Sequence, residues 1–105
     1  MIERHHYFKL KAEHAHPEGR DEVVRRILEV LPSVPGVIGV SAGVPADADA
    51  ERSWDVFVTV RFASLGEIDG YRAHPTHRDF VDRFLSPRID VKKAWNFETR
   101  SVGPG

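Results

Sequence analysis

The segment Tyr71-Arg-Ala-His-Pro-Thr-His-Arg-Asp-Phe-Val-Asp-Arg-Phe84 places a phenol and two imidazoles directly before an amphipathic helix. The apolar face of that helix is formed by Phe80, Val81, Phe84 and Leu85, which recur at helical spacing. His77 lies three residues before Phe80, so its ring is expected to face the same buried side. Pro75 suits a first helical turn and forces His74 into extended backbone, so the helix carrying Tyr71 should end there. This break could fold Tyr71 back toward His77.

The pairing of Tyr71 with His77 leaves two interpretations open. A phenol and an imidazole that converge on an enclosed space can exchange protons with a ligand. They can equally be two hydrogen-bonded core residues. His74 is a further candidate ligand contact, although capping the turn is its more expected role. His74 and His77 are spaced like metal ligands, but no third ligand is fixed nearby, so no metal is expected.

Outside this segment, alternation of apolar and polar residues predicts four strands, at about 2–11, 37–44, 54–62 and 91–99. Apolar residues at helical spacing predict a first helix whose face spans 23–31 and which Pro32 ends. The stretch 45–52 is expected to be an exposed hairpin loop. Ser64 followed by Glu67 predicts a capping box at the start of the short helix that carries Tyr71.

The resulting order, β-α-β-β-α-β, predicts an α+β, ferredoxin-like fold with a four-stranded antiparallel sheet and both helical regions on one face. The apolar sheet face, including Trp54, Trp95 and Phe97, is expected to lie under the helices. Tyr7 and Phe57 on the opposite face give it more apolar surface than a solvated sheet needs. A homodimer that packs through this open sheet face is therefore expected.

Length and composition set the remaining bounds. The 105 residues predict one domain, over 1–100, followed by a flexible tail at 101–105. The formal net charge of −1 gives no electrostatic reason to expect a nucleic acid or a membrane as partner. The sequence contains no Cys, which excludes disulfides and a thiolate nucleophile. Without a signal-peptide pattern or a long apolar run, a cytoplasmic location is expected.

The residues resemble the stress-responsive α/β-barrel (Dabb) family, whose ferredoxin-like subunits pair into a dimeric α+β barrel. The resemblance is carried by Phe8-Lys-Leu-Lys11, Leu31-Pro-Ser-Val-Pro-Gly36, Trp54-Asp55 with Val-Phe-Val-Thr-Val-Arg-Phe62, Ser64-Leu-Gly-Glu67, Tyr71-Arg-Ala-His-Pro-Thr-His77 with Phe80, and Ala94-Trp-Asn-Phe97. The family more often has Asp at the position of Asn96.

A resemblance of this kind implies a fold more firmly than a reaction. One plant member is a polyketide cyclase that works by aldol chemistry without a cofactor, and its catalytic Tyr and His fall on Tyr71 and His77. Two further pocket histidines of that enzyme are not matched: one falls on Val56 and the other near Arg4, with His5 one residue out of register. The resemblance therefore implies His77 as a base, Tyr71 as a hydrogen-bond donor, and no cofactor.

An apolar pocket between sheet and helices is the expected ligand site. Its expected lining is Arg4, His6, Val56, Val58, His74, Phe84 and Trp95, beside Tyr71 and His77. Arg4 on the inward face needs an anionic partner, or it reaches water from the strand end.

Three functions follow from this pocket. The first is binding of a small apolar or aromatic ligand without catalysis. The alternative is a polyketide cyclase-like lyase that uses His77 and Tyr71, and a weaker one is a cofactor-free monooxygenase.

Overall fold

The computed structural model describes residues 1–103. Its strands are β1 (Ile2–Leu10), β2 (Gly39–Gly43), β3 (Val56–Phe62) and β4 (Ile89–Glu98). Its helices are α1 (Pro17–Val30), the 3₁₀ turn η1 (Leu31–Ser33), α2 (Ala48–Ser53), α3 (Glu67–Ala73), α4 (Pro75–Phe80), the π-helical turn η2 (Val81–Leu85) and α5 (Ser86–Arg88). The tail predicted to be flexible falls partly on residues 104 and 105, which lie outside the described residues.

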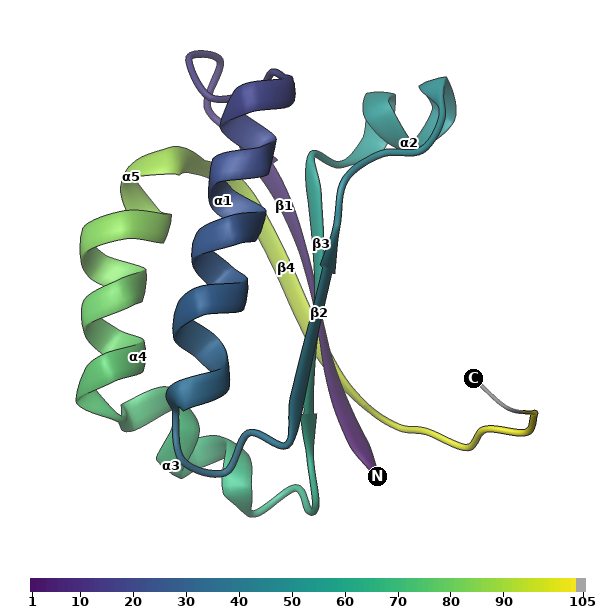
Figure 1. Cartoon of the computed structure of the whole chain (residues 1–105), viewed down its shortest axis with the longest axis vertical. Helices are drawn as coiled ribbons and strands as arrows, with labels where there is room; N and C mark the ends of the chain where they lie inside the picture. Colours follow the sequence, from purple (N-terminus) through teal and green to yellow (C-terminus); the bar gives the residue numbers. More distant parts are fainter. Residues whose placement is uncertain (104–105) are drawn as a thin grey trace.

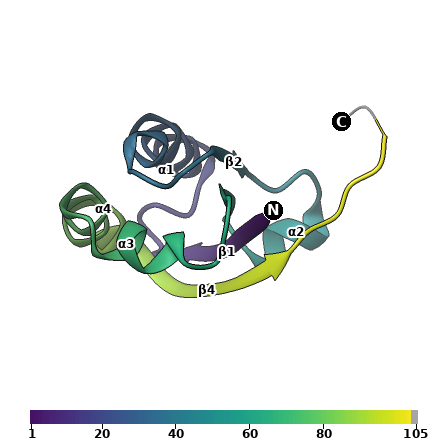
Figure 2. The same ribbon diagram turned by 90° about the horizontal axis from the view of Figure 1, so that it is seen from below.

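All neighbouring strands are antiparallel, and the sheet order is β2-β3-β1-β4. This order confirms the predicted ferredoxin-like α+β fold. Figures 1 and 2 show α1 and α4 side by side on one face of the sheet. Within residues 1–103, no helix lies along the middle of the opposite face, and α2 lies beyond the ends of β2 and β3 (Figure 1). None of the helices within residues 1–103 is long and apolar enough to cross a membrane.

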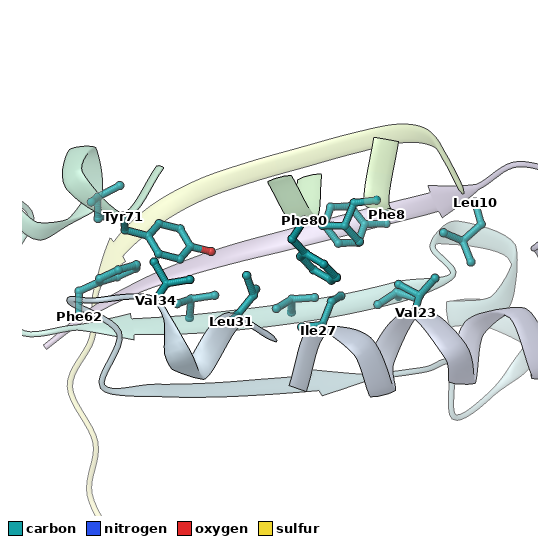
Figure 3. Close-up of a cluster of buried hydrophobic side chains, with 14 residues drawn as sticks. Phe8, Leu10, Val23, Ile27, Leu31, Val34, Phe62, Tyr71 and Phe80 are labelled. Carbon is teal, nitrogen blue, oxygen red and sulfur yellow. The ribbon is translucent and has the colours of Figure 1, made fainter. Parts of the chain in front are cut away.

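The core fills the layer between the sheet and the helices (Figure 3). Strand β3 contributes its alternate residues Val56, Val58, Val60 and Phe62, all of which are buried. Helix α1 covers them with Val23 and Ile27, one turn apart on the same face. The period-two pattern of β3 and the helical pattern of α1 therefore meet as predicted.

Strand β4 contains a bulge that reverses the predicted orientation of its side chains. Leu10 pairs with Ile89 while Lys9 pairs with Val91, so Asp90 has no partner across the ladder. Ile89 packs on the core, and one extra residue turns the following odd-numbered positions to the opposite face. Trp95 pairs with His5, and both lie on the uncovered side of the sheet.

The prediction that Trp95 and Phe97 lie under the helices is therefore wrong. Each side chain is 50% exposed in the single chain. Trp54, also expected under the helices, packs on Tyr7, with 5.7 Å between the ring centroids. We call the set His5, Tyr7, Phe57, Trp95 and Phe97 the open sheet face. Its members touch one another through aromatic contacts across β1, β3 and β4.

Two local predictions also need correction. The expected loop at 45–52 contains α2, because the Asp47 side chain accepts a hydrogen bond from the Ala50 amide and caps this short helix. The expected capping box at Ser64 does not form. Helix α3 begins at Glu67 without a side-chain cap, and the Ser64 backbone carbonyl accepts the Glu67 N–H instead.

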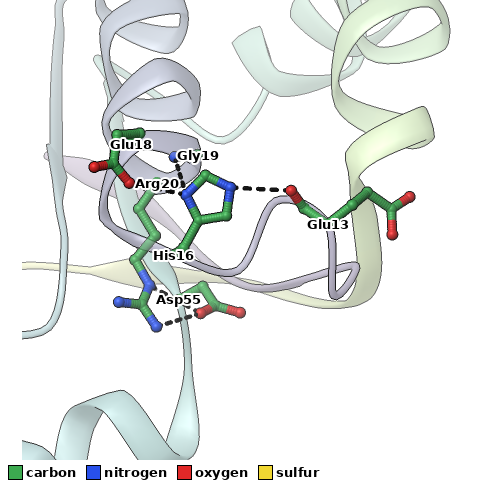
Figure 4. Close-up of polar contacts among 6 residues, drawn as sticks. All are labelled: Glu13, His16, Glu18, Gly19, Arg20 and Asp55. Atoms are coloured by element: carbon green, nitrogen blue, oxygen red, sulfur yellow. Dashed lines mark hydrogen bonds and ion pairs between the residues drawn. The ribbon is translucent and has the colours of Figure 1, made fainter.

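A polar cluster fastens the start of α1 to the sheet (Figure 4). The carboxylate of Asp55 accepts a hydrogen bond from Arg20 Nε at 3.0 Å and one from the Leu10 amide at 2.8 Å, and Arg20 Nη2 forms an ion pair with it at 2.9 Å. His16 caps α1 by accepting a hydrogen bond from the Gly19 amide. Gly19 is required there, because a Cβ would lie 2.0 Å from the His14 carbonyl oxygen. This cluster fixes α1 at the end opposite to Tyr71.

Candidate functional site

A cavity of about 730 Å³ lies between the β1–β4 half of the sheet and the helices α3, α4 and η2. The sheet supplies Arg4, His6, Val58, Lys92 and Ala94 to its lining, and the helices supply Tyr71, His77, Val81 and Leu85. The other lining residues differ in burial: the apolar Phe8, Ile27 and Leu31 are buried, whereas the polar ones are exposed, namely Asp69, Arg72, Arg78, Asp82, Ser86 and Asp90. A concave apolar space with a few convergent polar groups is the usual form of a small-molecule site.

Tyr71 is buried at the inner wall of the cavity, and only 1% of it is exposed. Its ring meets the edge of Phe62, with 5.0 Å between centroids, and Figure 3 shows its hydroxyl pointing into the layer between sheet and helices. That hydroxyl has no hydrogen-bond partner among residues 1–103. Burial raises the pKa of the Tyr71 phenol, and the nearby Arg4 partly opposes the rise. The phenol therefore stays protonated and can donate a hydrogen bond.

His77 stands beside Tyr71 in the first turn of α4, and the two ring centroids are 4.4 Å apart. Nδ1 of His77 lies 3.2 Å from the backbone carbonyl oxygen of Arg72. Because a carbonyl only accepts, Nδ1 carries the proton and Nε2 keeps a free lone pair. Burial lowers the pKa of His77, and the bond to the Arg72 carbonyl opposes that change. The ring is thus a neutral base oriented by the backbone.

His6 reaches the cavity from β1, between its partners Val58 on β3 and Ala94 on β4. Its Nε2 atom is buried and has no hydrogen-bond partner within the described chain. Burial, helped by the positive charge of Arg4, lowers the pKa of His6 to about 3. The ring is therefore uncharged under ordinary conditions and offers the cavity an unpaired polar atom.

Arg4 lies two residues before His6 on the same strand face and also lines the cavity. Its Nη1 donates a hydrogen bond of 2.9 Å to Oδ1 of Asn96, its cross-strand neighbour on β4. Burial lowers the pKa of Arg4, and the positive charge of Arg72 adds to the decrease. Arg4 therefore combines the two predicted positions: it lines the cavity, and it is partly exposed to solvent.

Five of the predicted site residues thus meet at one cavity: Arg4, His6, Val58, Tyr71 and His77. Val56 does not line it, because it lies nearer the other end of β3, beside Asp55 and Trp54. His74 does not line it either. Its Nδ1 accepts the Thr76 amide at 3.1 Å and caps α4, the role expected for it apart from ligand contact.

Phe84, predicted to line the pocket, points elsewhere. Its ring stacks on Phe80 at 5.3 Å, and the Arg88 guanidinium lies 3.9 Å from its centroid. The π-helical turn η2 changes the angular spacing of the residues. Val81 and Leu85 then face the cavity in place of Phe84. Trp95 is absent from the cavity for the reason given above, the bulge in β4.

The contribution of β4 was not predicted from the sequence, namely the lining residues Lys92 and Ala94 and the bond that Arg4 donates to Asn96. A prediction that β4 starts at Ile89 and has a bulge at Asp90 would have placed these residues at the cavity. A bulge, however, leaves no clear pattern in a single sequence. No group of three or more potential metal ligands that could hold an ion occurs in the part of the chain that the structure describes.

Comparison with known protein families identifies the family of this chain. The model of the stress responsive A/B barrel domain (Dabb) matches residues 2–94. The chain belongs to the Dabb family. No curated protein matches this Dabb chain by sequence.

Solved structures share the fold of this Dabb chain at low sequence identity. A Dabb family protein from Mesorhizobium loti has 17% identity and a TM-score of 0.78, over 95% of this chain and 97% of that chain. A dimeric ferredoxin-like protein from Thermobifida fusca has 20% identity and a TM-score of 0.74, over 93% and 90% of the two chains. The hydroxynitrile lyase of Passiflora edulis has 15% identity and a TM-score of 0.73, over 98% and 97%.

Proposed function

We propose that this Dabb protein is a homodimer whose subunits each bind a small organic ligand in the cavity beside Tyr71 and His77. The observation that carries the proposal is a pair of buried polar atoms without partners, the Tyr71 hydroxyl and Nε2 of His6. A buried polar group without a hydrogen bond costs about 1–3 kcal/mol. Two such groups lie at one cavity of about 730 Å³. A ligand that forms hydrogen bonds with both would remove this cost, which favours ligand binding.

The dimer is inferred from the open sheet face. Trp95 and Phe97 are half exposed there, and Tyr7 and Phe57 pack against the same aromatic group. Contiguous apolar surface of this kind is normally covered by a partner. A second copy fits because the face is continuous across β1, β3 and β4, and a fold neighbour is described as dimeric. The cytoplasmic location stays a prediction from the sequence.

Binding can be tested directly by two-dimensional NMR with the native dimer and small aromatic compounds. We expect backbone signals of cavity residues such as Val58 and Tyr71 to shift, while signals of α2 stay unchanged. If no compound moves the cavity signals more than those of α2, the ligand-binding proposal is wrong.

A second candidate is cofactor-independent proton transfer within the same cavity. It is favoured by the opposite pKa shifts of its two central groups: burial keeps His77 neutral and Tyr71 protonated. Such a pair has the protonation states that a base and a hydrogen-bond donor need. Nε2 of His77 would remove the acidic proton between two carbonyls, and the Tyr71 hydroxyl would donate to the enolate oxygen. The enolate carbon would attack a second carbonyl, and His77 would return its proton to the alkoxide.

The catalytic proposal is tested with linear polyketide and β-dicarbonyl compounds, followed by mass spectrometry and NMR. We expect the native protein to close or cleave at least one of them, and His77→Gln and Tyr71→Phe to lose turnover while the dimer persists. His74→Gln is the matched control, because that histidine caps α4 outside the cavity. Turnover that survives His77→Gln would exclude His77 as the base.

A further inference from the structure

The cationic group at the cavity wall lacks an anionic partner. Two other arginines anchored in the fold are paired, Arg20 with Asp55 at 2.9 Å and Arg88 with Glu22 at 3.1 Å. No carboxylate among residues 1–103 lies within ion-pair distance of Arg4, whose one protein hydrogen bond goes to the neutral amide of Asn96. Arg4 is partly buried, and a neutral acceptor leaves its charge without a counterion.

The charges around Arg4 increase this imbalance. Arg72 lies close enough to lower the pKa of Arg4, and Lys92 and Arg4 together help to lower that of His6. Three aspartates, Asp69, Asp82 and Asp90, also line the cavity, but all three are exposed at its edge and none pairs with Arg4. Arg72, Arg78 and Lys92 are exposed at the same edge, so among the charged lining residues within 1–103 only Arg4 is partly buried.

We propose that Arg4 binds the carboxylate of the ligand, so that the cavity takes small organic acids with an apolar or aromatic body. The planar guanidinium has donors to spare beyond the bond to Asn96, and it suits paired donation to a carboxylate. The apolar body of the acid then lies against Val58, Val81 and Leu85, with Tyr71 and His6 as further hydrogen-bond partners. This inference rests on the proposed function and adds to it the class of ligand.

The test compares two probes of equal size that differ in charge, 4-hydroxybenzoate and 4-hydroxybenzamide, by NMR and calorimetric titration of the native dimer. We expect the benzoate to bind about tenfold more tightly, which is the effect of roughly one charge-assisted hydrogen bond. In Arg4→Gln the preference should disappear, because Gln keeps a donor for Asn96 but has no charge. Arg4→Lys should keep part of the preference. Arg25→Gln, on the exposed side of α1, should keep all of it.

The outcomes separate the inference from the proposed function. If both probes shift the cavity signals with equal affinity, the cavity binds ligands but Arg4 does not select acids. If Arg4→Gln keeps the preference for benzoate, the selecting cation is another residue and the inference is wrong. If neither probe moves the cavity signals, the ligand-binding proposal and the inference fail together. Unfolding curves and NMR spectra of each variant show whether it has kept the native fold.

Discussion

The ring centroids of Tyr71 and His77 are 4.4 Å apart, although five residues and a helix break separate the two in the chain. Pro75 produces this approach. It forces His74 into extended backbone with ψ of 136°, which ends α3 and starts α4 in a new direction. Two helices replace one continuous helix, and both rings can then face the same cavity. The approach of the two rings therefore depends on the helix break at His74-Pro75 as well as on the two side chains themselves.

Replacing Tyr71 by Phe should separate stability from function. The hydroxyl is buried and unpaired, so its removal should leave the free energy of unfolding unchanged or raise it by about 1 kcal/mol. Ligand binding, and turnover if the protein is an enzyme, should be lost. Urea unfolding and titration of the same sample measure both. Tyr7→Phe on the open sheet face is the control, and a Tyr71→Phe protein that loses several kcal/mol would reveal a structural hydrogen bond.

The stability of the fold should fall as the pH is lowered, through His6. An unfolded histidine binds a proton below about pH 6.5, whereas His6 in the fold has a pKa of about 3. Its contribution to stability is therefore complete above about pH 6.5 and is lost as the pH falls from there toward 3. Between pH 7 and pH 5 the loss should be about 2 kcal/mol. The lowered pKa of His77 acts in the same direction.

Urea unfolding at several pH values measures this slope. In His6→Gln the slope should be smaller, since the substituted side chain does not titrate. His14→Gln, in the stretch between β1 and α1 and outside the cavity lining, is the matched control for the same type of substitution. An equal slope in native protein and His6→Gln would mean that His6 does not remain neutral in the fold.

The cluster around Asp55 should be the most sensitive polar site away from the cavity. Asp55→Ala leaves the mostly buried Arg20 guanidinium and the Leu10 amide without their acceptor. Breaking a buried ion pair from one side costs about 3–5 kcal/mol. Glu22→Ala, which breaks the more exposed pair with Arg88, should cost about 1 kcal/mol or less. Thermal and urea unfolding measure the stability of both variants. Similar losses of stability would contradict the prediction that the Asp55 cluster is the more sensitive site.

Charge placed on the open sheet face should prevent association. Trp95→Lys puts an ammonium group into the centre of the proposed dimer interface, and sedimentation should then detect monomer at concentrations where the native protein is dimeric. Leu65→Lys is the control, because Leu65 is equally apolar and 60% exposed but lies before α3. A native chain that sediments as a monomer would contradict the proposed dimer.

Most of the fold could be predicted because its patterns are local. The alternation in β1 and β3 and the spacing in α1 identify their buried faces without knowledge of their neighbours. The β4 register could not be predicted, because the bulge at Asp90 is decided by pairing with Lys9 and Leu10 on a distant strand. Trp95 and Phe97 were predicted to face the helices because they are apolar, whereas both lie on the open sheet face.

Some residues of the candidate site could likewise be predicted from local sequence patterns, and others could not. Tyr71 and His77 follow from a motif within seven residues, and Arg4, His6 and Val58 follow from regular strands. The orientation of Phe84 depends on a π-helical turn, which the sequence pattern does not distinguish from an α-helical one. Asn96 was noted as a departure from the family pattern, but its bond to Arg4 depends on the β4 register.

The bulge has a consequence for how assembly and ligand affinity are linked. Because β4 alternates, Trp95 faces the proposed partner subunit, while its neighbour Ala94 lines the cavity and Asn96 lies on that same side of the sheet, bound to Arg4. Any displacement of this strand on dimer formation moves Asn96, and with it the guanidinium of Arg4 that Asn96 holds in place. Affinity for an acid should therefore depend on protein concentration, through the fraction of chains that are paired.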